Sequence, residues 1–252
     1  IEGTMINMFF HDDEWMISTR SNIGAKNSWD GKIPFDKMFK EIAGTEWFDE
    51  LDKECSYSYI LRHIKNRIIS PVERNDIFLI ECNRFKDGIV QVEELPIIDG
   101  INNIITISPE DLYHYNNYLP YSMKGFTMKQ CNYRMNWINP NYVYVSGLKM
   151  NNNHKFLNYI ELRQKRLLNE YLSYFPEDQF LFNEYRDNYN KIKQNLYESY
   201  VSVFITKEKK MKEVNYSIKP LMYELHKYYK ATNNKINIKT VSDYLQNIPC
   251  KK

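Results

Sequence analysis

Cysteine and histidine are the side chains here with the widest chemical range, since both types bind metals and act as nucleophiles or bases. None of the cysteines forms a Cys-x-x-Cys pair, because the four lie far apart, at Cys55, Cys82, Cys131 and Cys250. The five histidines also lack the spacings typical of zinc ligands. We therefore expect no metal site, and free thiols in a reducing compartment such as the cytoplasm.

Charge is distributed unevenly along the chain. The formal net charge is +2, yet residues 151–252 hold 18 Lys and Arg against 11 Asp and Glu, which leaves 16 against 21 for residues 1–150. A basic second half attracts polyanions or simply carries solvated helix faces, and charge alone favours neither interpretation. Tyr185, Tyr189 and Tyr200 recur there at helical spacing. Such a stripe stacks on bases or, more often, packs in a core.

Hydrophobic patterning predicts an α+β domain over residues 1–150 and an all-helical C-terminal domain over residues 151–252. Alternating runs at 5–10 and 14–19 predict a hairpin, and apolar spacing predicts a helix from 34 to about 51. Further strands are expected at 57–61, 66–70, 77–82, 89–93, 101–107, 125–130 and 134–138, and helices at 156–172, 185–203, 221–229 and 241–245. No apolar run approaches the ~20 residues of a membrane span, so we expect no membrane partner.

Short motifs in the first half follow a characteristic order. Glu2-Gly3-Thr4 begins the first strand, and Ile17-Ser18-Thr19-Arg20 lies in the hairpin. Asn66-Arg67-Ile68-Ile69 and Lys124-Gly125-Phe126-Thr127 follow. In this order they resemble the phage-type RNA ligase family of nucleotidyltransferases, most closely ligase-like proteins of large DNA viruses. The resemblance covers most of the chain. It implies an adenylation domain with antiparallel sheets, and a location in the host cytoplasm or a virus factory.

The chemistry that the resemblance implies is the joining of RNA ends, with ATP and Mg²⁺ as cofactors. A lysine attacks the α-phosphate of ATP, AMP passes to an RNA 5′-phosphate, and a 3′-hydroxyl displaces it. The family pattern Lys-x-[Asp/Glu]-Gly aligns Ile1 with x, so the nucleophile position falls directly before Ile1. Neighbouring cations and desolvation must depress the pKa of such a lysine.

Other motifs depart from the family pattern where they serve catalysis. Ile60 stands at the acidic position of the third motif; Glu81 in a later strand is a candidate substitute, although nothing in the spacing requires it. Lys124 stands where an acid organises magnesium, and Asn136 and Ile138 replace two lysines of the fifth motif. A lysine at a metal position repels Mg²⁺. Each lost phosphate-contacting donor removes about 3–4 kcal/mol of transition-state stabilisation.

Basic residues remain in these motifs, and under the resemblance they predict a phosphate-holding cleft. The nucleotide- or phosphate-binding candidates are Glu2, Gly3, Arg20, Arg67, Lys124, Lys129 and Arg134, with Arg62 beside them. Arg20 and Arg67 are otherwise ordinary strand-end surface residues. Three functions stay open: an RNA ligase-like nucleotidyltransferase with degenerate motifs, a catalytically inactive pseudo-ligase that binds RNA or protein, and a viral interaction protein that works through its helical half.

Overall fold

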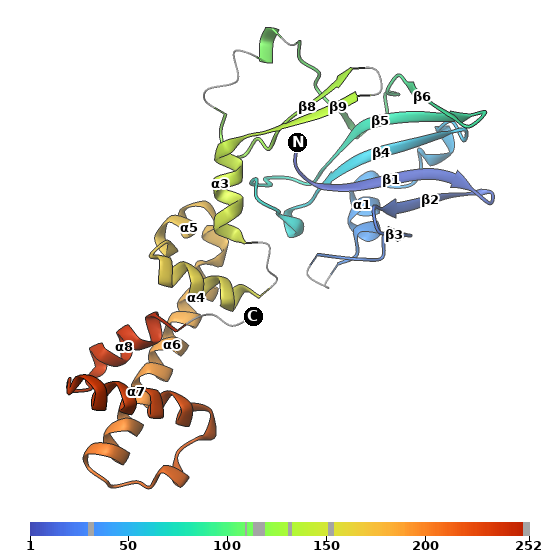
Figure 1. The fold of residues 1–252 in the computed structure, drawn as a ribbon. Coiled ribbons are helices and arrows are strands. Elements are labelled where there is room, and N and C mark those ends of the chain that lie inside the picture. The colour runs from blue at the N-terminus through green and yellow to red at the C-terminus, as the bar shows by residue number, and fades with distance from the viewer. Residues whose placement is uncertain (30–32, 109, 113–118, 131–132, 151–153, 249–252) are drawn as a thin grey trace. The chain divides into compact units, whose positions relative to one another are not determined.

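The structure is a computed structural model that describes residues 1–29, 33–108, 110–112, 119–130, 133–150 and 154–248. Contacts divide the chain into two compact units, Ile1–Gly147 and Leu148–Lys252. The first combines antiparallel sheets with helices, and the second is helical (Figure 1). In the described ranges, no helix has the length and apolar character needed to cross a membrane.

A seven-stranded sheet forms the centre of the first unit. Its order is β3-β2-β1-β4-β5-β6, and β7 pairs with β5 in parallel while every other pair is antiparallel. The strands are β1 (Thr4–His11), β2 (Glu14–Thr19), β3 (Asn22–Ile23), β4 (Cys55–Arg62), β5 (Asp76–Lys86), β6 (Ile89–Glu93) and β7 (Asn102–Asn103).

One face of this sheet carries the core of the first unit. Strict alternation along β4 buries Tyr57, Tyr59 and Leu61 on this face. Helix α1 (Phe35–Ala43) covers it, with the Phe39 ring edge-on to Tyr59 at 5.3 Å between centroids. Since α1 occupies this face, any polar site on the sheet belongs to the opposite one.

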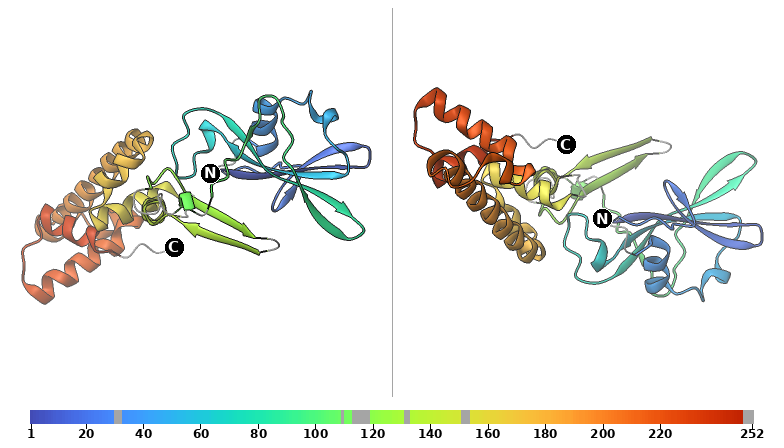
Figure 2. Two further views of the ribbon diagram at one scale, coloured as in Figure 1. Left: turned by 90° about the horizontal axis from the view of Figure 1, so that it is seen from above. Right: turned by 90° about the horizontal axis from the view of Figure 1, so that it is seen from below.

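A separate hairpin lies on the side of the sheet away from α1 (Figure 2). It consists of β8 (Gly125–Gln130) and β9 (Tyr133–Ile138), and helix α3 (Pro140–Lys149) follows it directly. The hairpin thus stands opposite the sheet face that α1 leaves uncovered.

The second unit is built from α4 (Lys155–Lys165), α5 (Leu168–Tyr174), α6 (Gln179–Tyr200), a π-helical turn (Val201–Ile205), α7 (Lys219–Thr232) and α8 (Ile238–Gln246). Tyr171 and Phe182 stack at 5.1 Å in an aromatic core at one end. Buried Leu196, Leu225 and Val241 join α6, α7 and α8 at the other end.

Most predicted elements are confirmed. The hairpin at 5–19 forms β1 and β2, and the strands expected at 57–61, 77–82, 89–93, 125–130 and 134–138 are all present. Helices occur in the three last predicted positions, as α6, α7 and α8. Helix α3 was not expected from the sequence.

Four predicted boundaries or elements are wrong. The first helix ends at Ala43 because Gly44 takes a positive φ of 66°, and residues 45–51 form only a 3-10 turn. The helix expected over 156–172 divides into two, since Arg166 adopts a left-handed φ of 61°. Residues 66–70 form no strand, and the strand expected at 101–107 shrinks to Asn102–Asn103.

Candidate phosphate-binding site

A bulge in β5 gives the uncovered sheet face its acidic residue. Tyr59 pairs with Leu79, but the neighbouring Ser58 pairs with Glu81, so β5 has one extra residue between the two pairs. Without it, Glu81 would share the apolar face with Leu79, because side chains two apart point the same way. The bulge instead places Glu81 in a polar row with Ser58 and Asn7, whose side chains are hydrogen-bonded at 2.9 Å.

Two cations of the β8–β9 hairpin contact Glu81 in this polar row. Lys129 and Arg134 are direct cross-strand partners, an arrangement that is repulsive by itself. Both pair with Glu81 Oε1, Lys129 Nζ at 3.0 Å and Arg134 through Nη2. The Glu81 side chain is 9% exposed, whereas Lys129 and Arg134 remain 43% and 57% exposed. One carboxylate thus holds two solvent-facing cations and leaves one positive charge uncompensated.

Glu2 anchors the start of the first strand. Its Oε2 accepts hydrogen bonds from the backbone N–H groups of Ile69 at 2.9 Å and Ser70 at 2.6 Å, and its Oε1 accepts one from the Tyr142 hydroxyl. Burial, followed by this bond to Glu2, raises the pKa of Tyr142. These partners explain why residues 66–70 form no strand: two of their N–H groups go to a carboxylate instead of a ladder.

Gly3 lets the chain approach β4 closely. A Cβ atom at this position would lie 2.4 Å from the Leu61 carbonyl oxygen and 2.6 Å from Ile60 Cγ2. No other residue fits without moving the backbone of β4. Glu2 and Gly3 therefore hold the strand in place through their contacts with protein atoms.

Lys124 and Arg62 act on the amino group of Ile1 through their charge. Burial lowers the pKa of this amino group, and the charges of Arg62 and Lys124 lower it further. Lys124 also lies over the Tyr142 ring, with Nζ 5.9 Å from the centroid. Arg62 donates from Nη2 to the Pro71 carbonyl at 2.8 Å. Both cations therefore have protein contacts of their own in the first unit.

The other two candidate arginines lie apart from these contacts. Arg67 donates from Nε and Nη2 to the Ile69 carbonyl, at 3.2 and 3.0 Å, and so braces the turn that binds Glu2. Arg20 is exposed in the turn after β2, and no hydrogen bond or ion pair among the described residues links it to Glu81 or Glu2. The structure thus brings Lys129 and Arg134 together on Glu81 and leaves Arg20 outside.

Sequence reasoning missed Asn7, Ser58 and Tyr142 as site residues. The polar positions of otherwise apolar β1 and β4 are a usable pattern for the first two, since period two places them on one face. Tyr142 lies in the unexpected helix α3, and no pattern in its neighbourhood indicates it.

Two tyrosines of the stripe in the second unit pack in a core, which is the more common of the two roles expected from the sequence. Tyr189 is 8% exposed and Tyr200 is 3% exposed, so both pack in the helical core. The interpretation of these two rings as stacking surfaces for bases is wrong.

These side chains fit phosphate and do not fit magnesium. Glu81 already holds two cations, and Glu2 already accepts from two N–H groups and a hydroxyl. Lys124, which the resemblance aligns with a magnesium-organising acid, is exposed. Searching the described parts of the chain for three or more His, Cys, Asp or Glu able to hold a metal gives no group.

Comparison with known proteins adds no relative. No model of a protein family matches the chain, and a search of curated proteins finds no match. Only the motifs and the geometry of the site therefore bear on function.

Proposed function

We propose that this chain is a ligase-like protein that binds the 5′-phosphate of RNA between the sheet and the β8–β9 hairpin, without magnesium-dependent nucleotidyl transfer. The observation that carries the proposal is the pair of exposed cations, Lys129 and Arg134, held on the nearly buried Glu81. Phosphate accepts charge-assisted hydrogen bonds from both types of side chain. The carboxylate keeps the two cations together, so little ordering is needed when an anion binds.

The polar row supports a ligand with more than one phosphate oxygen. Asn7 and Ser58 lie beside Glu81 on the sheet, and Thr127 and Asn136 lie beside the cations on the hairpin, their side chains 2.9 Å apart. Such amide and hydroxyl groups serve phosphate and ribose oxygens alike. Among these side chains, Glu81 is the single carboxylate that could bind a magnesium ion.

Binding of short RNAs with and without a 5′-phosphate tests the proposal. We expect the native chain to bind 5′-phosphorylated RNA about tenfold more tightly than the 5′-hydroxyl form. K129A and R134A should each remove most of this preference. Glu81→Gln removes the carboxylate that keeps the two cations together and should reduce the preference for the 5′-phosphate. Fluorescence anisotropy at fixed salt measures each affinity.

The matched control is Lys86→Ala, since Lys86 is an exposed cation on β5 outside the polar row. It lowers the net charge as K129A does, and it should leave the 5′-phosphate preference unchanged. Equal losses of affinity for 5′-phosphorylated RNA in K86A and K129A would mean that only net charge matters and would contradict the proposed site.

A second candidate function, enzyme-AMP formation, follows from the motif order, which puts the nucleophile position directly before Ile1. The charges of Arg62 and Lys124 lower the pKa of the Ile1 amino group, and the same charges would act on a lysine at the preceding position. Such surroundings make an amine more nucleophilic at neutral pH. The test compares chains that carry lysine or alanine directly before Ile1, each incubated with labelled ATP and magnesium. A denaturation-resistant label on the lysine form alone would establish transfer and overturn the binding-only proposal.

A further inference from the structure

The basic excess of the second unit is concentrated in one segment. Residues 207–239 hold nine lysines and three glutamates, with no Arg or Asp. Eight of these lysines are exposed, and Lys219 is half-buried. None of the nine ammonium groups forms an ion pair or a hydrogen bond within the described residues, in contrast to Lys129 and Lys155 elsewhere. The charge of this segment is therefore available to a partner.

Helix α7 arranges part of this charge around an aromatic ring. Lys219, Tyr223, Lys227 and Lys230 follow one another at steps of four, four and three residues, so they share one face of the helix. We call this face the α7 strip. The opposite face is packed: Met222 and Leu225 are fully buried against α6 and α8.

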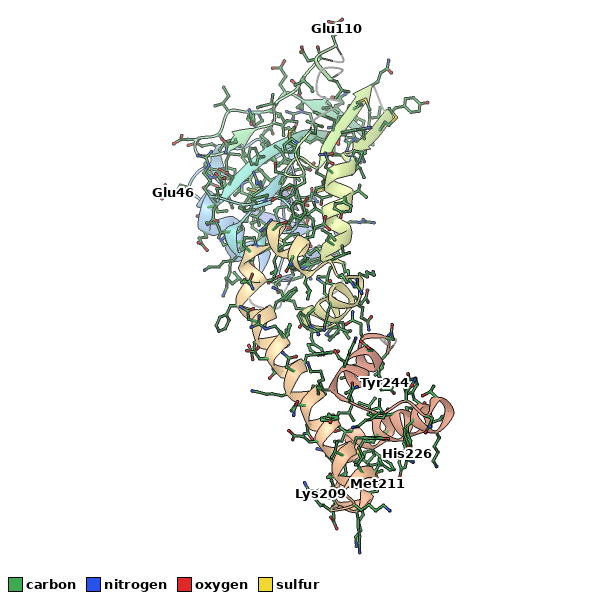
Figure 3. The ribbon with its side chains drawn as sticks, turned by 90° about the vertical axis from the view of Figure 1, so that its left-hand side faces the viewer. Glu46, Glu110, Lys209, Met211, His226 and Tyr244 are labelled. Atoms are coloured by element: carbon green, nitrogen blue, oxygen red, sulfur yellow. The ribbon has the colours of Figure 1, made fainter. Side chains whose placement is uncertain are left out.

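Contacts with the end of α6 fix the orientation of α7. His226 stacks on Phe204 of the π-helical turn, with ring centroids 4.0 Å apart and planes within 10°. His226 Nδ1 lies 3.3 Å from the Tyr200 hydroxyl. Figure 3 shows His226 on this helix, and Lys209 and Met211 on the segment that follows α6. The strip is therefore held on the surface of a packed helix.

Exposed tyrosines distinguish this surface from a merely basic one. Tyr223 is 56% exposed, and Tyr216, just before α7, is 83% exposed. Tyr228 and Tyr229 are also partly exposed, at 42% and 38%, but by helical spacing they lie off the α7 strip. Unpaired bases stack on such rings while lysines neutralise the backbone, which is how proteins hold single strands without sequence preference. An acidic peptide offers the rings no series of bases, and a duplex keeps its bases stacked inside.

We infer that the α7 strip and its flanking lysines form a binding surface for single-stranded nucleic acid, which distinguishes strands by their unpaired bases and not by their sequence. The inference rests on the second unit alone and is independent of the 5′-phosphate site. Its ligand needs no terminal phosphate, since stacking and internal phosphates suffice.

The test uses the full chain and a fluorescent 20-nucleotide oligouridine with a 5′-hydroxyl end. We expect affinity to fall linearly with the logarithm of salt concentration. The double variant K227Q/K230Q should bind about tenfold more weakly and lower the salt slope by about 1.4, or ~0.7 for each lost contact. Tyr223→Ala should weaken binding about tenfold, and Tyr223→Phe should restore it, because phenylalanine also stacks.

The matched control is K191Q/K193Q on α6, which removes the same charge from the same unit outside the strip. Circular dichroism verifies folding of each variant. Equal losses from both double variants, or unchanged binding in Y223A, would overturn the inference. Equally tight binding of a duplex, or binding only to vesicles that contain phosphatidylserine, would also overturn it. K129A and R134A should not affect this ligand, so failure here is distinguishable from failure of the 5′-phosphate site.

Discussion

Replacement of Glu2 by alanine gives a quantitative test of the anchor at the start of the first unit. The change leaves the N–H groups of Ile69 and Ser70 and the hydroxyl of Tyr142 without their acceptor in a buried site. A buried donor without a partner costs about 1–3 kcal/mol, so three of them, with some relaxation, should lower the free energy of unfolding by about 4 kcal/mol. That is a large part of the ~5–15 kcal/mol of a typical domain.

Tryptophan fluorescence during urea unfolding measures this loss in the first unit alone, because all four tryptophans, Trp15, Trp29, Trp47 and Trp137, lie there. With an m-value of about 2 kcal/mol/M, the midpoint should fall by about 2 M. Tyr142→Phe removes one of the three bonds and should cost about 1.5 kcal/mol. The double variant E2A/Y142F should show a coupling of about 1–2 kcal/mol, since both changes delete the same bond. A loss below ~1 kcal/mol in E2A, or full additivity, would refute the anchor.

Three further predictions concern buried groups. Asp178 is 5% exposed and accepts from Tyr171 Oη at 2.6 Å and Lys155 Nζ at 2.5 Å, so D178N should lower the stability of the second unit by about 2 kcal/mol in thermal circular dichroism. A loss below ~0.5 kcal/mol would contradict this. Burial raises the pKa of the Cys55 and Cys82 thiols, that of Cys82 to about 12, and native alkylation at pH 8 should be ~100-fold slower than in urea. Rapid labelling of either cysteine, seen by peptide mass spectrometry, would refute their burial. Folded Cys82 keeps its proton above pH 9.0, the ordinary pKa of a thiol, so the stability of the first unit should fall from pH 9 to 12. Cys82→Ala should make that fall less steep in urea titrations, and an unchanged slope would contradict the prediction.

Elements with a strong local pattern were predictable from the sequence. The β1–β2 hairpin follows from two alternating runs, and its turn contains Asp12 and Asp13, which take positive φ values of 50° and 62° as tight hairpin turns require. Strand β4 alternates buried and more exposed residues without interruption. Such elements depend on neighbours in sequence, which is why patterning finds them.

Long-range contacts determine the rest. Residues 66–70 have the composition of a strand, but Ile69 and Ser70 donate to Glu2, more than sixty positions away. The bulge between the Ser58 and Tyr59 pairs decides which face Glu81 occupies, and a shift of one residue reverses that face. Glu81, Lys129 and Arg134 were each candidates from the sequence. Their ion pairs with one another depend on where the β8–β9 hairpin lies, which no local pattern predicts.

The two proposed surfaces differ in how their positive charge is compensated, and this gives them different salt responses. At Glu81, a phosphate competes with an existing carboxylate for Lys129 and Arg134, so few counterions are released and recognition depends on geometry. The lysines of residues 207–239 have no acidic partner among the described residues, so an incoming strand displaces their counterions and affinity depends steeply on salt. Selectivity for a 5′-phosphate should therefore persist at salt concentrations that abolish binding to the α7 strip. The charge difference between the halves of the sequence gave no such distinction, because paired and unpaired lysines contribute equally to a net charge.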